Sequence, residues 1–194
     1  MEVAIIGLGM HPFGRSPHKT GLQQGAEAAR EALADAGLSW NDIECGYGGS
    51  QDGGNADAIV NELGLSGLQF TNIFNGCATG GSSLHAAYSA IKSGEYRNAL
   101  VLGFDKHPRG AFNALPADWG IDDWYGETGL MLTTQYFGMK IQRYMHEYDI
   151  SEQALISVAE KAFFNGSITP TAWRKQCAIC SSSEVELMPH RRPR

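Results

Sequence analysis

The residues best suited to covalent chemistry lie in the stretch FNGCATGGSS, residues 74–83. Its thiol, Cys77, follows an apolar run and precedes a helix-like pattern that begins with small residues. Backbone amides at the start of a helix stabilise an anion, which favours a thiolate. Small neighbours let a substrate carbonyl approach N–H groups that can bind an oxyanion. The placement fits a nucleophile, and it also fits a buried cysteine in close helix–sheet packing.

Two other motifs lack the context that their chemistry requires. GLGMHP, residues 7–12, has a proline where a dinucleotide-binding fingerprint needs its third glycine, and no helix pattern follows directly. Cys177 and Cys180 have CxxC spacing, but no second Cys/His pair at zinc-finger spacing and no thioredoxin-like strand accompany them. We therefore expect no bound cofactor and no metal site.

Strand-like and helix-like segments alternate around Cys77. Apolar runs ended by glycine or turn residues predict strands at residues 3–7, 43–47, 68–74 and 98–104. Helical spacing of apolar residues predicts helices at residues 20–36, 55–63 and 82–93. In the last of these helices the pattern places four residues inward: Leu84, Ala87, Tyr88 and Ile91. This alternation is typical of an α/β fold with a mainly parallel sheet covered by helices.

Beyond residue 105 the sequence pattern changes. Residues 106–129 are rich in Gly, Pro, Asp and aromatic residues and predict a long loop. Amphipathic helices are expected at residues 130–148 and from Ser151 to a stop at Asn165-Gly166. We therefore divide the chain into an α/β half-domain, a helical segment and an atypical, disordered tail, at residues 1–118, 119–175 and 176–194.

Composition narrows the class of protein. The 194 residues are 43% hydrophobic and 19% charged, an ordinary soluble composition. The formal net charge of −6 argues against a general nucleic-acid binder. The sequence has no apolar run of membrane-spanning length and no signal-peptide pattern at its start. The four cysteines are too few for a disulfide scaffold, so we expect a cytoplasmic protein.

The stretch NGCATGGSSLHAAYSAIKSGEYRNALVLGFDK resembles the active-site segment of the thiolase superfamily. VAIIGLGMHPFGR and AREALADAGL resemble the opening of the sterol-carrier-protein-type thiolases, as does the later RYMHEYDISEQALISVAEKAFFNGSITP. The resemblance covers roughly residues 1–175. It implies one half, the N-terminal one, of a duplicated α/β fold, followed by the start of an inserted loop domain.

The resemblance also implies a reaction. Cys77 would accept an acyl group from a coenzyme A thioester, and thiolysis or condensation would release it. Four residues would shape its turn: Asn75, Gly76, Gly80 and Gly81. Weaker expectations are coenzyme A contacts at Lys106 and Arg109 and an acyl channel at Trp119 and Trp124. Homodimers or homotetramers are expected.

None of the histidines matches the catalytic histidines of the family, and His85 lies about two helical turns past Cys77. We therefore expect little turnover from the 194-residue chain alone. Two alternatives stay open. One is a thiolase-like aldolase that cleaves a β-hydroxyacyl-CoA, such as one with a steroid side chain, beside a small nucleotide-fold-like partner protein. The other is a non-catalytic subunit that binds acyl-CoA or lipid.

Overall fold

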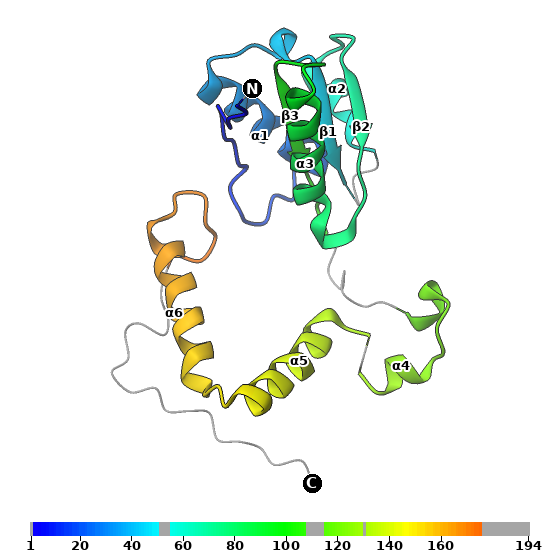
Figure 1. Ribbon diagram of the computed structural model, residues 1–194, viewed down its shortest axis with the longest axis vertical. Coiled ribbons are helices and arrows are strands. Elements are labelled where there is room, and N and C mark those ends of the chain that lie inside the picture. Colours follow the sequence, from blue (N-terminus) through cyan, green and yellow to red (C-terminus); the bar gives the residue numbers. More distant parts are fainter. Residues whose placement is uncertain (1, 51–54, 108–114, 130, 176–194) are drawn as a thin grey trace. The chain divides into compact units, whose positions relative to one another are not determined.

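The computed structural model describes residues 2–50, 55–107, 115–129 and 131–175, without the side chain of Trp119. The chain divides into two compact units, residues 1–107 and 108–194. The first unit contains the sheet and Cys77, and the second is helical in its described part (Figure 1). The predicted domain boundaries at residues 118 and 175 stay predictions.

A parallel three-stranded sheet forms the centre of the first unit. Its strands are β1 (Cys45–Gly49), β2 (Gln69–Asn72) and β3 (Ala99–Gly103), in the order β2-β1-β3. Each lies within or close to a predicted strand, and the connections between them contain helix, as parallel pairing requires. The predicted α/β class with a mainly parallel sheet is confirmed.

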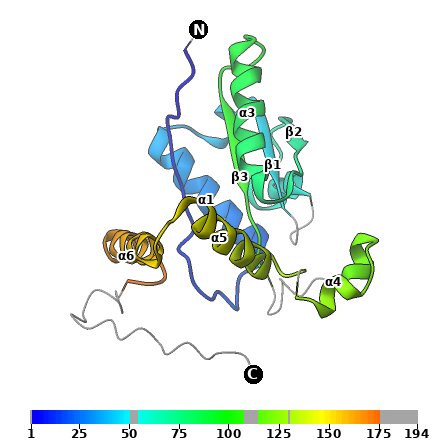
Figure 2. The ribbon, with the colours of Figure 1, turned by 60° about the horizontal axis from the view of Figure 1, so that its bottom comes forward.

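Helix α1 (Gly21–Ala36) covers one face of this sheet (Figure 2). It begins at a capping box, in which the Thr20 hydroxyl accepts the Gln23 N–H and the Gln23 side chain accepts the Thr20 N–H. It ends at Gly37 in the left-handed conformation. The short helices Ala56–Ile59 (η2) and α2 (Val60–Leu63) lie on the same face. The buried core is Ala26, Ala29, Leu33, Ile43, Ala56, Ile59, Leu100, Leu102 and Phe104.

Helix α3 (Thr79–Lys92) packs on the opposite face of β1 and β3. Its buried residues are Ser83 and Ala87, whereas Leu84 and Tyr88 are each 47% exposed. The prediction that Leu84 and Tyr88 point inward is therefore wrong for this chain. The sheet-facing side of α3 needs small residues because the helix lies close to the backbone of β1, where a Cβ on Gly49 would lie 2.4 Å from the Thr79 methyl carbon.

The N-terminal segment does not form the predicted strand at residues 3–7. It runs instead along α1, where the Leu8 N–H donates to the Asp35 carboxylate (2.9 Å) and the Met10 N–H to the Glu31 carboxylate (2.8 Å). An apolar run becomes a strand only where a neighbouring strand accepts its backbone hydrogen bonds. Here carboxylates of α1 accept the N–H groups of Leu8 and Met10, just after the apolar run.

The regular secondary structure in the described part of the second unit is helical. It comprises the 3-10 helix Pro116–Trp119 and helices α4 (Trp124–Glu127), α5 (Thr133–Tyr148) and α6 (Glu152–Ile168). The predicted long loop thus contains two short helices, and α6 continues past its expected stop at Asn165-Gly166. None of the described helices is long and apolar enough to cross a bilayer.

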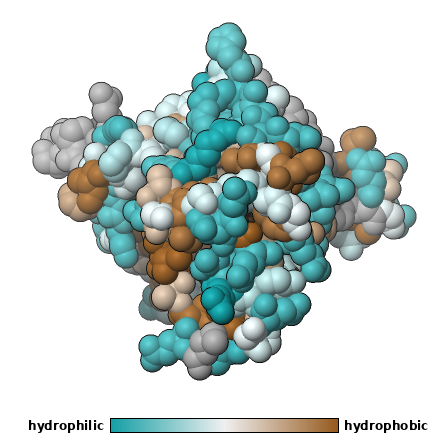
Figure 3. Space-filling view, turned by 90° about the horizontal axis from the view of Figure 1, so that it is seen from above, coloured by the Kyte–Doolittle hydropathy of each residue, from teal (hydrophilic) through white to brown (hydrophobic). Residues whose placement is uncertain are grey.

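Large apolar side chains reach the surface of the first unit. Figure 3 shows hydrophobic residues scattered among polar ones on one face of the molecule. The exposed large hydrophobics of this unit are Ile5, Ile6, Leu8, Met10, Phe13, Leu65, Phe74, Leu84 and Tyr88. Phe74 is 74% exposed and lies two residues before the turn that carries Cys77.

Candidate active site

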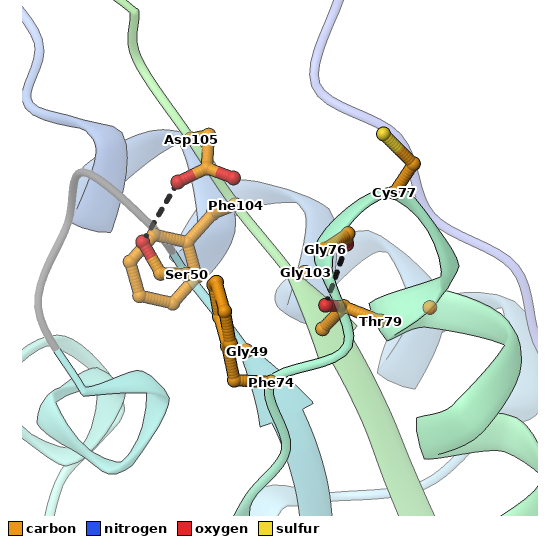
Figure 4. Close-up of a pocket in the computed structure, with 10 residues that line it drawn as sticks. Gly49, Ser50, Phe74, Gly76, Cys77, Thr79, Gly103, Phe104 and Asp105 are labelled. Carbon is orange, nitrogen blue, oxygen red and sulfur yellow. Dashed lines mark hydrogen bonds between the residues drawn. The ribbon is translucent and has the colours of Figure 1, made fainter. Parts of the chain in front are cut away.

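A pocket of about 330 Å³ lies where the three parallel strands end. Gly49 ends β1 and Ser50 follows it, Phe74 comes after β2, and Asp105 comes shortly after β3. The turn before α3 and the first residues of α3 close another side of the pocket (Figure 4). The carboxyl ends of parallel strands are the usual place for a binding site in an open α/β sheet.

Cys77 lies in a 3-10 turn, Gly76–Ala78, that leads directly into α3. The turn requires glycine at position 76, whose φ is +51°. The thiol of Cys77 is free and exposed, and it borders the pocket. The structure therefore places this thiol at the junction of a strand end and a helix start, as the sequence predicted.

Three polar side chains hold this turn. The Thr79 hydroxyl accepts the Asn75 N–H at 2.9 Å and donates to the Gly76 carbonyl at 2.8 Å. The Asn75 side-chain amide donates to the Ser82 hydroxyl at 2.8 Å. In the described part of the chain, the backbone N–H groups of Gly76 and Cys77 donate to no protein acceptor. They are left for a ligand or solvent.

The wall of the pocket on the strand side carries a polar pair and two aromatic rings. The Ser50 hydroxyl donates to the Asp105 carboxylate at 3.0 Å, and Figure 4 shows this pair apart from Cys77 across the pocket. The aromatic rings of Phe74 and Phe104 also line it. The sequence patterns did not indicate that Ser50, Asp105 and Thr79 line this pocket. The first two follow predicted strands, so the rule that parallel strands end together could have indicated them.

Cys77 also borders a second, more open hollow of about 570 Å³, together with Ala78, Gly81, Ser82 and His85. His85 shares this hollow with Cys77, but no hydrogen bond joins the two side chains in the described structure. His11 lies elsewhere, 3.5 Å from the Glu27 carboxylate. Among the described residues, no histidine is hydrogen-bonded to the Cys77 thiol.

The five residues predicted for the active-site turn lie together. Gly76 and Cys77 lie in the turn and Asn75 caps its start, whereas Gly80 borders the first pocket and Gly81 the second hollow. A Cβ added at Gly80 or Gly81 would have nothing within 4 Å, so packing does not require glycine at either position. Their catalytic role stays a prediction.

Of the weaker candidate residues, Lys106 and Trp124 have described side chains. The Lys106 ammonium donates to the backbone carbonyls of Ser16 and Lys19. Trp124, in the second unit, stacks on Tyr125 with 3.9 Å between ring centroids. Arg109, the side chain of Trp119, Cys177 and Cys180 lie outside the described residues. In the described ranges, no three His, Cys, Asp or Glu side chains are grouped to hold a metal ion.

No family model matches this chain. Over 164 residues it is 30% identical to sterol carrier protein 2 of Oryctolagus cuniculus, a match that covers 76% of this chain and 30% of that protein. Over 180 residues it is 26% identical to an acetyl-CoA acetyltransferase of Methanothermobacter thermautotrophicus, covering 88% of this chain and 46% of the relative.

A solved structure, the Ltp2-ChsH2(DUF35) aldolase, is similar over 88% of this chain and 44% of its own, with a TM-score of 0.69 and 26% identity. The chain resembles one half of a thiolase-superfamily protein. The predicted resemblance and the thiolase-type half-fold are thus confirmed. The chain spans about a third to a half of the length of the curated relatives it matches. Thiolase-superfamily relatives include both an acetyltransferase and an aldolase, by their names.

Proposed function

We propose that this chain carries the nucleophilic site of a thiolase-type acyl-CoA acyltransferase. The Cys77 thiolate attacks the thioester carbonyl carbon and forms a tetrahedral oxyanion. Its collapse breaks the bond to the coenzyme A sulfur, which leaves as a thiolate and takes up a proton. The acyl group remains on Cys77 as a new thioester. A second coenzyme A thiolate then accepts it, or a CoA-linked carbanion attacks it and forms a carbon–carbon bond.

The observation that carries this proposal is the position of Cys77. Its free, exposed thiol borders a pocket at the strand ends and stands at the start of a 14-residue helix. The helix dipole favours a negative charge there. The N–H groups of Gly76 and Cys77 have no protein acceptor in the described structure, so they can serve as donors to an oxyanion at the attacked carbonyl.

Turnover by this chain is expected to be slow. A nucleophilic cysteine normally has a base within hydrogen-bond reach, and no described histidine fulfils that role for Cys77. We therefore expect the 194-residue chain to be acylated once and then to release the acyl group slowly. As in the family, we propose a homodimer or homotetramer as the working form.

The test is acyl-enzyme trapping on the full chain. After incubation with acetyl-CoA, intact mass should rise by one acetyl group, and peptide mapping should place that group on Cys77. Cys77→Ala should lose the adduct, whereas Cys45→Ala, which changes a buried thiol in the same unit, should keep it. An adduct that persists in Cys77→Ala would contradict the proposal. Rapid multiple turnover by the wild-type chain would contradict the expected slow release.

An aldolase is the second candidate, because the Ltp2-ChsH2 aldolase is similar over most of this chain. In that case the chain would cleave a β-hydroxyacyl-CoA, such as one with a steroid side chain, beside a small nucleotide-fold-like partner protein. Retro-aldol cleavage without an adduct on Cys77 would favour this function over acyl transfer. The measurement is product analysis of a β-hydroxyacyl-CoA mixture, alongside the mass of the protein.

A non-catalytic subunit that binds acyl-CoA or lipid is the third candidate, and the sterol carrier name of a relative favours it. Binding of this kind would be saturable and would survive Cys77→Ala without any covalent adduct. Equilibrium dialysis with labelled acyl-CoA, on the wild-type chain and on Cys77→Ala, separates it from acyl transfer.

A further inference from the structure

Thr79 is the side chain most tightly tied to the turn that carries Cys77. Its hydroxyl acts twice, as acceptor for the Asn75 N–H and as donor to the Gly76 carbonyl. These two groups stand on either side of the bond that leads from Asn75 into Gly76. A single hydroxyl, two residues after the thiol, therefore binds the backbone on both sides of the Asn75–Gly76 peptide bond, and Figure 4 shows its bond to Gly76.

The rest of the Thr79 side chain is anchored in the sheet. Its methyl carbon lies so close to Gly49 that a Cβ added at Gly49 would stand 2.4 Å from it. The Thr79 carbonyl in turn accepts the hydroxyl of the buried Ser83 at 2.8 Å. Because both ends of Thr79 are held, its hydroxyl is fixed relative to β1 and to the first turn of α3.

The hydrogen bonds of Thr79 determine which backbone groups of the turn already have a partner. The Asn75 N–H and the Gly76 carbonyl are occupied by the Thr79 hydroxyl, whereas the N–H groups of Gly76 and Cys77 have no acceptor in the described part of the chain. Donors preorganised in this way act best on a charge that develops during reaction. A turn without these bonds would be free to rotate its amides away.

We propose that Thr79 is a positioning residue, whose hydroxyl holds the turn so that the Gly76 and Cys77 N–H groups face the oxyanion formed at Cys77. The inference rests on the proposed role of Cys77 as acyl acceptor. It assigns Thr79 no contact with the substrate, since it acts through the backbone of Gly76 and Cys77.

The test compares two reagents that both consume the Cys77 thiolate. p-Nitrophenyl acetate acylates it through a tetrahedral oxyanion, whereas iodoacetamide alkylates it without one. The ratio of the two rate constants therefore cancels any change in ionisation or exposure of the thiol and reports the oxyanion donors. Neither reagent requires a coenzyme A site, so the ratio is measurable on the full 194-residue chain.

Three variants complete the experiment. Thr79→Val keeps the shape and the methyl contact with Gly49 but loses both hydrogen bonds, and Thr79→Ser keeps the hydroxyl but loses the methyl. We expect Thr79→Val to lower the acylation-to-alkylation ratio about tenfold or more, because removing a single oxyanion donor costs about 10²–10³-fold in enzymes. Thr79→Ser should restore most of the ratio. Thr79→Ala serves in place of Thr79→Val where circular dichroism shows that the valine variant is not folded.

The outcomes separate this inference from the proposed function. An unchanged ratio in Thr79→Val, or an equal fall in Thr79→Ser, would overturn it, the latter by showing that packing of the methyl against Gly49 is what matters. If acetyl-CoA acetylates wild-type Cys77 but the ratio is unchanged in Thr79→Val, only the role of Thr79 is refuted and the proposed function stands. A ratio that depends on the hydroxyl, without acetylation by acetyl-CoA, supports Thr79 and refutes the acyl-CoA function.

Discussion

Cys45 and Cys77 are residues of one type in one α/β unit, and their surroundings give them opposite properties. Cys45 begins β1 and is 1% exposed, whereas Cys77 is exposed at the edge of the pocket. Burial raises the pKa of the Cys45 thiol, and a hydrogen bond with Tyr47 offsets only part of that rise. Cys45 is therefore a packing residue, and of these two described thiols only Cys77 is placed to react.

Alkylation should reveal this difference directly. In the native chain at neutral pH, iodoacetamide should modify Cys77 and leave Cys45 unmodified, because only an exposed thiolate can attack it. After unfolding in urea both should react. Peptide mass mapping over time gives the two rates. Equal rates in the native chain would mean that Cys45 is accessible in solution.

The raised pKa of Cys45 also predicts a loss of stability in alkali. Folding disfavours the Cys45 thiolate, so the folded form gains stability from this thiol below the ordinary pKa of 9.0 and loses it as the pH rises through the folded value. Burial raises the pKa of Tyr47 as well, with the same sign. The free energy of unfolding in urea should fall above about pH 9 and fall less steeply in Cys45→Ala. An identical pH dependence in the variant would contradict this cause.

At the scale of elements, helix α1 and the N-terminal segment differ in how far local sequence decides them. The signals of α1 are local, since Thr20 and Gln23 bind backbone N–H groups at its start and Gly37 ends it. Residues 3–7 have the composition of a strand, but a strand depends on a distant partner. In the structure residues 3–7 form no strand, and carboxylates of α1 accept the N–H groups of Leu8 and Met10 just beyond them. The predicted helix is therefore confirmed and the predicted strand is wrong.

The capping box of α1 should contribute measurably to stability. Thr20→Ala removes the acceptor of the Gln23 N–H and should lower the free energy of unfolding by about 1 kcal/mol, the usual cost of losing a hydroxyl N-cap. Thr20→Ser is the matched control and should stay close to wild type. Urea unfolding followed by circular dichroism measures both. A loss of equal size in Thr20→Ser would exclude the hydrogen bond as the cause.

For the whole molecule, the outer side of α3 is the feature that local patterns misjudged. Helical spacing indicates only that one side is apolar, whereas which side meets the sheet depends on how closely the helix approaches it. The small residues Ser83 and Ala87 take that place, and Leu84 and Tyr88 are left half exposed. Thiolase-superfamily relatives are longer than this chain, which spans 30% and 46% of two of them.

Substitutions on the two sides of α3 should therefore differ in cost. The double change Leu84→Gln and Tyr88→Gln should alter the free energy of unfolding by less than about 0.5 kcal/mol, as exposed positions usually do. Ala87→Leu should lower it by about 1–3 kcal/mol because it overpacks a buried contact with the sheet. Urea unfolding of the three chains is the measurement. A large loss in the double variant would show that this side of α3 is covered in solution.

The sequence by itself determined the alternation of strands and helices, the cap of α1, and the place of Cys77 between a strand and a helix. These follow from residues close together in the chain, which make their bonds locally. Only the tertiary structure decided the order of strands, the face of α3 that is buried, the fate of residues 3–7, and the meeting of Ser50 and Asp105 in the pocket that Cys77 borders. Each of these depends on contacts between segments far apart in sequence, and no local spacing encodes which segments will meet.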